Sequence, residues 1–328
     1  MKKSLLHIVQ KTNIVDDFKD FNSAEFPDYD HKYLYIKHSG LVEVIKLISQ
    51  SKEIHIHGLF DRWLPILIFI FGRGKKVFWY LWGGDVYNDI LKASWKHKIY
   101  NALAKRIFVK NFVTYLVTYL PGDVEFVRDH YGFDGMVINS NLYTSNVVGD
   151  RTELLDEVVG DRILLGNSAV VENNHIAGIK AISRNSFFEK YEILIPLSYG
   201  DEIYRKSIEE FSASSTLRIK LLKNFMSLTE YRKTISQVSI CVFYHEYQMA
   251  MGNIIFLLFS KKLVFLNPET SPYRFFLDNG VFVLKLSDLD SFSGSELYER
   301  ELSKNRVLIS EIFSRKRLVM QYRELYEQ

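Results

Sequence analysis

Short apolar runs rich in β-branched and aromatic residues alternate along the chain with longer segments whose apolar residues recur at helical spacing. This alternation is typical of β-α-β units, in which helices connect the parallel strands of one sheet. Helices are predicted between the strands, including residues 41–49 and a long helix over 90–104. The strands fall into two series, at 5–9, 33–36, 53–57, 77–82, 112–118 and 136–138, and at 162–165, 191–196, 217–221, 238–244, 263–266 and 281–284.

The acidic, turn-like segment 152–161 separates the two series. A chain of 328 residues is long enough for two domains. We therefore predict an α/β protein with two Rossmann-like, doubly wound domains, at residues 1–150 and 161–305, and a charged helical tail at 306–328. Ligands of open α/β sheets bind outside the carboxyl ends of the strands. We expect the domains to face each other across a cleft lined by strand-end loops.

Composition narrows the class of protein. The hydrophobic fraction of 47% and the charged fraction of 25% are those of a folded globular chain. The single cysteine, Cys241, excludes an intrachain disulfide and fits a reducing cytoplasm. The net charge of +3 comes with no nucleic-acid-binding motif, so we expect no nucleic-acid partner. No P-loop or G-x-G-x-x-G motif is present, and we expect no cofactor.

Two features bear on membranes. The start of the chain lacks the long apolar core of a signal peptide. The longest apolar stretch, residues 63–71, is about half the ~20 residues that span a bilayer, so it is either a buried helix or an interfacial segment.

The loop after the first strand of the second series contains Gly166, Asn167 and Ser168. Small and amide-bearing residues let a ligand approach the backbone closely. Asn173 and Asn174 follow, before a helical run, and helix capping explains them as well as ligand contact does.

The loop after the fourth strand of this series leads through Gln248 to Gly252 and Asn253 at a predicted helix start. Free backbone N–H groups and the helix dipole there would suit a nucleotide diphosphate. Gln248 is a candidate for binding a sugar hydroxyl. Tyr199 is either a nucleotide contact or a core tyrosine.

Two candidates for the general base follow strands of the first series. His57 ends one strand before Gly58, and Asp85 follows the next strand after two glycines. Either side chain could remove a proton from a sugar hydroxyl, and we prefer Asp85 slightly. Structural roles compete in both cases: Asp85 could cap a helix, and His57 could be a buried structural histidine.

The segment 90–122 has no acidic residue, and its cations are interleaved with aromatic residues. Such a pattern is typical either of a helix that binds anionic lipid or of a solvated helix face. We take Trp82, Lys92, Lys96, Lys105 and Arg106 as candidate contacts to the acceptor or the membrane.

Metal binding is not expected. His55 and His57 lie two residues apart on one strand, but no third ligand with suitable spacing appears. The two D-x-D triplets, at 28–30 and 288–290, each lie in a predicted turn.

Several motifs together resemble a known family. They are His57-Gly58, the W-x-x-W-G-G-D-x-Y run at 79–87, L-G-N-S at 165–168, N-H-I-A at 174–177, I-P-L-S-Y at 195–199, and Gln248 with Gly252. In this order they resemble the bacterial 4-acetamido-4,6-dideoxygalactose transferases of enterobacterial common antigen assembly, over nearly the whole chain.

The resemblance implies a GT-B glycosyltransferase without a metal, peripheral to the inner face of the cytoplasmic membrane. It implies a dTDP-activated donor in the second domain and a polyprenyl-diphosphate-linked saccharide acceptor at the first. UDP or GDP donors and an O-antigen or capsule pathway stay open. Stereochemistry also stays open, because the E-x7-E pattern of retaining enzymes is absent: Ile254 lies eight positions after Glu246. A non-catalytic sugar-nucleotide-binding partner and a sugar-nucleotide epimerase are the alternatives.

Overall fold

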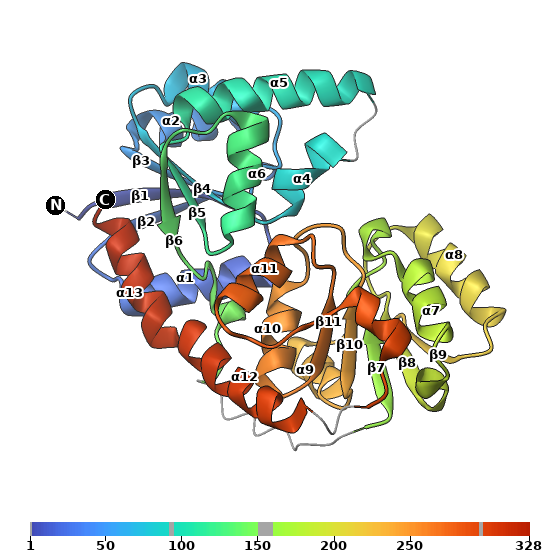
Figure 1. The fold of residues 1–328 in the computed structure, drawn as a ribbon. Helices are drawn as coiled ribbons and strands as arrows, with labels where there is room; N and C mark the ends of the chain where they lie inside the picture. Colours follow the sequence, from blue (N-terminus) through green and yellow to red (C-terminus); the bar gives the residue numbers. More distant parts are fainter. Residues whose placement is uncertain (1, 92–94, 150–159, 295–297) are drawn as a thin grey trace. The chain divides into compact units, whose positions relative to one another are not determined.

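The computed structural model describes residues 2–91, 95–149, 160–294 and 298–328 (Figure 1). The chain divides into two compact units. Unit 1 comprises Met1–Val147 and Arg315–Gln328, and unit 2 comprises Val148–Ser314.

Unit 1 contains a sheet of six parallel strands in the order β2-β1-β3-β4-β5-β6. Its strands are β1 (Ser4–Ile8), β2 (Asp30–Leu34), β3 (Glu53–His57), β4 (Lys76–Tyr80), β5 (Tyr115–Thr118) and β6 (Met136–Asn139). The chain reverses direction across the sheet between β1 and β3, so the carboxyl ends of these two strands form the switch point where ligands of such sheets bind.

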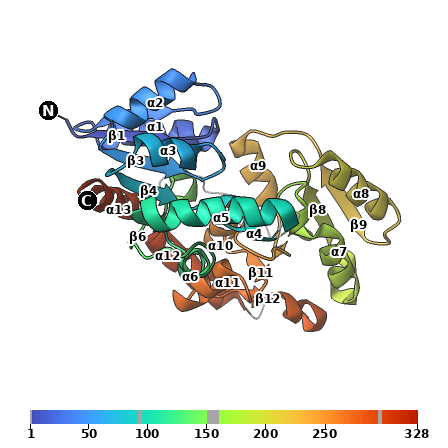
Figure 2. The same cartoon turned by 90° about the horizontal axis from the view of Figure 1, so that it is seen from above.

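Helices cover both faces of this sheet. Their bounds are α1 (Asn13–Glu25), α2 (Leu41–Gln50), α3 (Leu64–Phe71), α4 (Gly84–Leu91), α5 (Trp95–Phe112), α6 (Pro121–Tyr131) and α13 (Arg315–Tyr326). Helices α1 and α13 share one face, where the rings of Phe18 and Tyr322 lie 5.5 Å apart. Helices α2, α3 and α5 lie side by side on the opposite face (Figures 1 and 2).

Unit 2 contains a second six-stranded parallel sheet, in the order β12-β11-β10-β7-β8-β9. Its strands are β7 (Arg162–Leu165), β8 (Glu192–Pro196), β9 (Arg218–Leu222), β10 (Ile240–Phe243), β11 (Leu263–Leu266) and β12 (Leu284–Lys285). The switch point here lies between β7 and β10. Its helices are α7 (His175–Ser183), α8 (Glu202–Ala213), α9 (Leu228–Ile235), α10 (Met251–Phe259), α11 (Ser271–Asp278) and α12 (Glu299–Ile312).

The central strands of each sheet are mostly apolar and buried, because helices cover both faces. In unit 2 the residues Ile163, Leu165, Ile193, Val242 and Phe265 belong to one buried core. Each of the twelve predicted strands has a counterpart, and the prediction of two parallel α/β sheets is confirmed, but β12 covers only Leu284–Lys285 where the prediction was 281–284. Strand β2 begins earlier than predicted, at the polar residues Asp30 to Lys32, because an edge strand tolerates polar side chains.

The predicted long helix over 90–104 differs in its bounds. The structure has α4 ending at Leu91 and α5 extending from Trp95 to Phe112, so the predicted strand at 112–118 begins only at Tyr115. The charged tail forms α12 and α13, which belong to different units. Among the described residues, no helix is long and apolar enough to cross a bilayer.

Candidate functional site

The switch point of unit 2 carries a polar cluster. Gly166 follows β7 with a φ of +68°, a backbone conformation that L side chains rarely adopt. A Cβ at this position would lie 2.5 Å from Nε2 of His175 and 2.9 Å from Oδ1 of Asn173. Glycine is therefore required here by both backbone conformation and space.

Asn173 is the hub of this cluster. Its Oδ1 accepts hydrogen bonds from the Asn167 backbone N–H (3.1 Å) and from His245 Nε2 (2.9 Å). Its Nδ2 donates to the carbonyl oxygen of Ser168 at 3.0 Å. Asn174 stands at the N-cap position of α7, but its side chain donates to the Tyr244 carbonyl instead of capping the helix. The two asparagines thus join the loops after β7 and β10.

Three side chains of this region keep buried polar atoms without a hydrogen-bond partner among the described residues. They are Oδ1 of Asn167, Nε2 of His175 and Oε1 of Gln248. A buried polar atom without a partner costs free energy, which a ligand can recover by bonding to it. Asn167 and Gln248 were predicted to contact the donor, and both fit that role.

The start of α10 differs from the prediction. The helix begins at Met251, with Ala250 in the left-handed conformation before it (φ 54°). The N–H of Asn253 donates to the carbonyl oxygen of Ala250. We expected this N–H to be free for a ligand, and it is not. The N–H groups of Met251 and Gly252 have no intrahelical acceptor, because they belong to the first turn. The structure thus leaves the Gly252 N–H available, and its contact with a diphosphate stays a prediction; the Asn253 N–H is not available for that contact.

Tyr199 contacts Asn167, another of the predicted donor contacts. Its side chain is 56% exposed, which excludes the core role. Asn167 Nδ2 donates to its hydroxyl at 3.4 Å. The phenol of Tyr199 also helps to raise the pKa of Tyr231, after burial as the main cause, and Tyr231 accepts a hydrogen bond from Asn253 Nδ2 at 3.1 Å. Tyr199, in the loop after β8, therefore contacts the loop after β7 through Asn167.

The two histidines of this cluster are neutral at neutral pH. Burial lowers the pKa of His175 to about 4 and that of His245 to about 3. They therefore contribute hydrogen-bonding nitrogens rather than positive charge to this edge of the sheet.

In unit 1, Asp85 occupies the first turn of α4 and is buried. Its Oδ2 accepts hydrogen bonds from the Leu59 N–H (2.8 Å) and from Trp79 Nε1 (2.6 Å), and its Oδ1 accepts one from the Trp82 N–H (2.8 Å). Burial raises the pKa of Asp85, against the charge of Lys105 and these donors. The carboxylate thus holds together strand β4 and the loops after β3 and β4. It does not cap its helix, since its partners precede α4.

His57 lies on the sheet face beneath α1 and α13, fully buried. Its Nδ1 lies 2.6 Å from the hydroxyl of Tyr143, and its Nε2 lies 3.1 Å from Nδ1 of His7. Burial lowers the pKa of His57 well below 6.5. Of the two roles considered for His57, the structure favours the buried structural histidine, since both ring nitrogens are engaged inside the unit.

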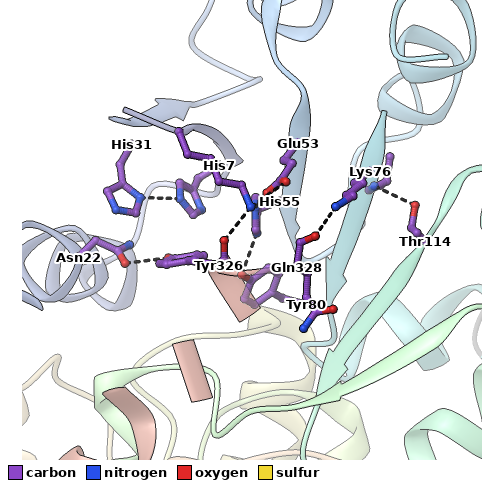
Figure 3. A network of polar contacts seen from close by, with 12 residues as sticks. His7, Asn22, His31, Glu53, His55, Lys76, Tyr80, Thr114, Tyr326 and Gln328 are labelled. Carbon is purple, nitrogen blue, oxygen red and sulfur yellow. Dashed lines mark hydrogen bonds and ion pairs between the residues drawn. The ribbon is translucent and has the colours of Figure 1, made fainter. Parts of the chain in front are cut away.

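The same face holds a wider network of histidines and tyrosines (Figure 3). His7 Nε2 lies 3.0 Å from His31 Nδ1, and His55 Nδ1 lies 3.0 Å from the Tyr80 hydroxyl. Among the described residues, no three histidine, cysteine or acidic side chains are arranged to hold a metal ion.

Trp82 lies at the carboxyl edge of the unit 1 sheet, directly after β4. Its Nε1 donates to the Tyr143 hydroxyl at 2.7 Å. Its ring meets the ring of Phe60 edge to face, with centroids 6.1 Å apart, and Phe60 is 41% exposed. This edge is therefore aromatic, which suits a sugar or an apolar ligand.

The basic residues predicted to contact the acceptor or the membrane differ in their exposure. Arg106 is exposed, as a surface contact requires. Lys105 is buried, which contradicts the prediction: its Nζ pairs with Asp89 at 3.1 Å, bonds to the Asp85 carbonyl and lies 5.1 Å from the centre of the Trp79 ring. Lys92 lies outside the described residues. Lys96 falls within α5, but its side chain is not among those described.

The sequence analysis selected the loops of unit 2 that form this cluster, but it missed two members of the cluster. His175 and His245 were not selected as site residues. The register of the parallel strands could have revealed His245, because β10 pairs with β7 and the loops after both strands must meet.

The fold resembles that of several solved structures. It matches sucrose-phosphate synthase from Thermosynechococcus elongatus (TM-score 0.68, 13% identity, covering 100% of this chain and 99% of that one). It also matches HepE from Anabaena in complex with UDP and glucose (TM-score 0.67, 11% identity, 99% and 98% covered) and WaaG, a glycosyltransferase involved in lipopolysaccharide biosynthesis (TM-score 0.57, 9% identity, 94% and 93% covered). The protein has the predicted GT-B fold of glycosyltransferases.

Residues 3–288 match the model of a single family, described as 4-alpha-L-fucosyltransferase, glycosyl transferase group 56. The chain belongs to this family and is a glycosyltransferase. The resemblance drawn from the sequence motifs is confirmed.

Proposed function

We propose that this glycosyltransferase transfers an amino-deoxyhexose from a nucleotide sugar to a saccharide carried on a polyprenyl diphosphate, in the assembly of a bacterial surface polysaccharide. The observation that carries the proposal is the cluster at the switch point of unit 2. There, Gly166 lets the side chains of His175 and Asn173 approach the loop closely, and buried polar atoms of Asn167, His175 and Gln248 lack partners among the described residues. A ligand with many polar groups, such as a nucleotide sugar, would supply these partners.

The donor would lie along the carboxyl edge of the unit 2 sheet. Its diphosphate would accept hydrogen bonds from the first-turn amides of α10 at Gly252 and from the loop containing Ser168, with the positive end of the helix dipole behind them. Tyr199 would contact the nucleoside, and Gln248 and Asn253 would contact the sugar by their side-chain amides. The UDP bound to the structurally similar HepE supports a nucleoside diphosphate, and dTDP, UDP and GDP are the candidates.

The acceptor would meet the carboxyl edge of the unit 1 sheet, where Trp82 and Phe60 offer an aromatic surface. Transfer releases the proton of the acceptor hydroxyl, and electrostatic stabilisation of the departing diphosphate lowers the barrier. Asp85 and His57 stay the predicted candidates for the base. Their present hydrogen bonds favour a positioning role for both, because either would have to give up a bonded partner to take a proton. The reaction would take place on the cytoplasmic face of the inner membrane, as the family resemblance implies.

Two measurements test the proposal. A nucleotide that binds the native state raises its apparent stability by RT ln(1 + [L]/Kd). In a thermal-shift series with dTDP, UDP and GDP, we therefore expect one of the three nucleotides to give the largest shift. The matching nucleotide sugar should then label a polyprenyl-diphosphate-linked saccharide. Conversion of the donor without any acceptor, or binding without transfer to any such lipid, would overturn the proposal.

A further inference from the structure

Helix α3 is apolar on every side. Leu64 and Ile68 are buried against the sheet, and Pro65 lies in the first turn. The outward side carries Phe69 and Ile70, with exposed fractions of 54% and 56%, and Trp63 before the helix is 70% exposed. A helix that is hydrophobic all round is ordinarily buried in a protein or a membrane.

The exposed apolar surface continues onto the two neighbouring helices. Helix α3 packs against α2 and α5, and the rings of Phe69 and Phe112 lie 5.4 Å apart. The three helices form one layer on the sheet (Figures 1 and 2). We call this surface the α2–α3–α5 face; its exposed large apolar residues are Leu41, Val42, Trp63, Ile66, Phe69, Ile70, Leu103 and Ile107. An exposed apolar patch of this extent marks an interaction surface.

The exposed charges of α5 and of the turn after α3 are positive, whereas α2 carries both signs, with Glu43 and Lys46 exposed. The exposed cations of α3, α5 and their flanking turns are Arg62, Arg73, Arg106 and Lys110. The sequence contains no acidic residue at 62–75 or at 103–122. Asp61 caps the start of α3 by accepting hydrogen bonds from the N–H groups of Trp63 and Leu64.

We propose that the α2–α3–α5 face binds the surface of a bilayer that contains anionic lipids. The apolar side chains of α3 would lie at the boundary of headgroups and acyl chains, and the cations would contact lipid phosphates. With eight residues, α3 is about 12 Å long, so it would lie in the interface without crossing it. A second copy of the chain is the less suitable occupant, because it would bring like charges together.

The position of this face gives it a use in the reaction. Helix α3 begins a few residues after the carboxyl end of β3, and Phe60 in that connection contacts Trp82. A face bound to the bilayer there would place the aromatic edge of unit 1 beside the membrane surface, where a lipid-linked saccharide emerges. This last step rests on the proposed function, whereas bilayer binding itself does not.

The full-length protein can be tested by co-sedimentation with vesicles of phosphatidylcholine, alone or with phosphatidylglycerol added. We expect binding to the anionic vesicles that weakens with salt, and a blue shift of tryptophan fluorescence on binding. Phe69→Ser combined with Ile70→Ser should lower the vesicle partition coefficient about ten-fold or more. Arg106→Gln combined with Lys110→Gln should lower it about twenty-fold on anionic vesicles and little on neutral ones.

Matched controls come from unit 2. Ile203 is 80% exposed on α8, and Lys206 is an exposed cation of the same helix, so Ile203→Ser and Lys206→Gln should leave the partition coefficient unchanged. The Phe69→Ser, Ile70→Ser variant should keep its thermal shift with nucleotide and its transfer to a short-chain, water-soluble acceptor. Loss of transfer in every variant and in the wild type would count against the proposed function alone.

Three results would overturn the bilayer assignment. They are wild-type protein that stays in the supernatant with anionic vesicles, α3 and α5 variants that bind as well as the wild type, and a lipid-free dimer that the α3 substitutions dissociate. The last result would show that a second copy covers the face.

Discussion

Replacing Asp85 by asparagine separates a positioning role from a catalytic one. The carboxylate accepts three hydrogen bonds, two at Oδ2 and one at Oδ1. Asparagine has a single acceptor oxygen. If that oxygen takes the place of Oδ2, the new NH2 group faces the Trp82 N–H; if it takes the place of Oδ1, the NH2 group faces the donors of Leu59 and Trp79. Either orientation sets donor against donor in a buried site.

The cost follows from the hydrogen bonds. A bond to a charged acceptor contributes about 1.5–3 kcal/mol, and a buried donor left without a partner costs a further ~1–3 kcal/mol. In its better orientation Asp85→Asn loses one such bond and leaves the Trp82 N–H unpaired, so we expect a destabilisation of about 3–5 kcal/mol. For a unit of this size, that lowers the melting temperature by roughly 6–20 °C.

Calorimetric melting and transfer kinetics on the same preparation decide between the roles. The control is Asp61→Asn, because asparagine caps a helix as well as aspartate does, so the melting temperature should hardly change. We expect Asp85→Asn to lose both stability and turnover. A melting temperature equal to that of the wild type, with turnover reduced about 10²- to 10⁴-fold, would refute the positioning argument and identify Asp85 as the base. Normal values of both would remove Asp85 from either role.

Three further predictions concern other parts of the chain. The pKa values of His7 and His57 are lowered well below 6.5 by burial, so the unfolded chain binds protons that the folded unit does not. Their contribution to stability is complete above pH 6.5 and is lost as the pH falls below it, by about 2 kcal/mol per histidine between pH 7 and pH 5; urea denaturation with no such loss would contradict this. Gly166→Ala should abolish the nucleotide-induced thermal shift, because its Cβ would collide with His175, and unchanged binding would remove Gly166 from the donor site. Tyr199→Ala should leave the melting temperature unchanged, since the side chain is largely exposed, and should weaken nucleotide binding measured by calorimetry about ten-fold, the effect of losing an aromatic contact.

The fold could be predicted because hydrophobic periodicity reports burial on both faces of a sheet. The central strands, such as β3, β4, β7 and β10, carry that signal most clearly, because they are buried along most of their length. The errors lie where periodicity is ambiguous. The polar start of β2 at Asp30 gave no apolar signal, and Phe112 is equally suited to the end of a helix and the start of a strand.

The side-chain roles were harder to predict, because they depend on which way an element faces. The two-residue period placed His55 and His57 on one face of β3, which the structure bears out. It could not say that α1 and α13 would cover that face. Lys105 is a similar case: the sequence shows a cation in a basic helix, and only the packing of α5 shows that it points inward to Asp89 and the Trp79 ring.

The carboxyl edges of the two sheets differ in the groups that they offer to a ligand. This difference supports the proposal that the acceptor binds at unit 1 and the donor at unit 2. In unit 1 the two predicted candidates for the base are satisfied internally, Asp85 by three donors and His57 by two neighbours. What remains exposed there is aromatic and apolar, and it leads directly into α3. In unit 2 the polar atoms of Asn167, His175 and Gln248 still lack partners among the described residues. An edge of that kind favours a ligand rich in hydrogen-bonding groups, and the edge of unit 1 favours one that arrives from a lipid surface.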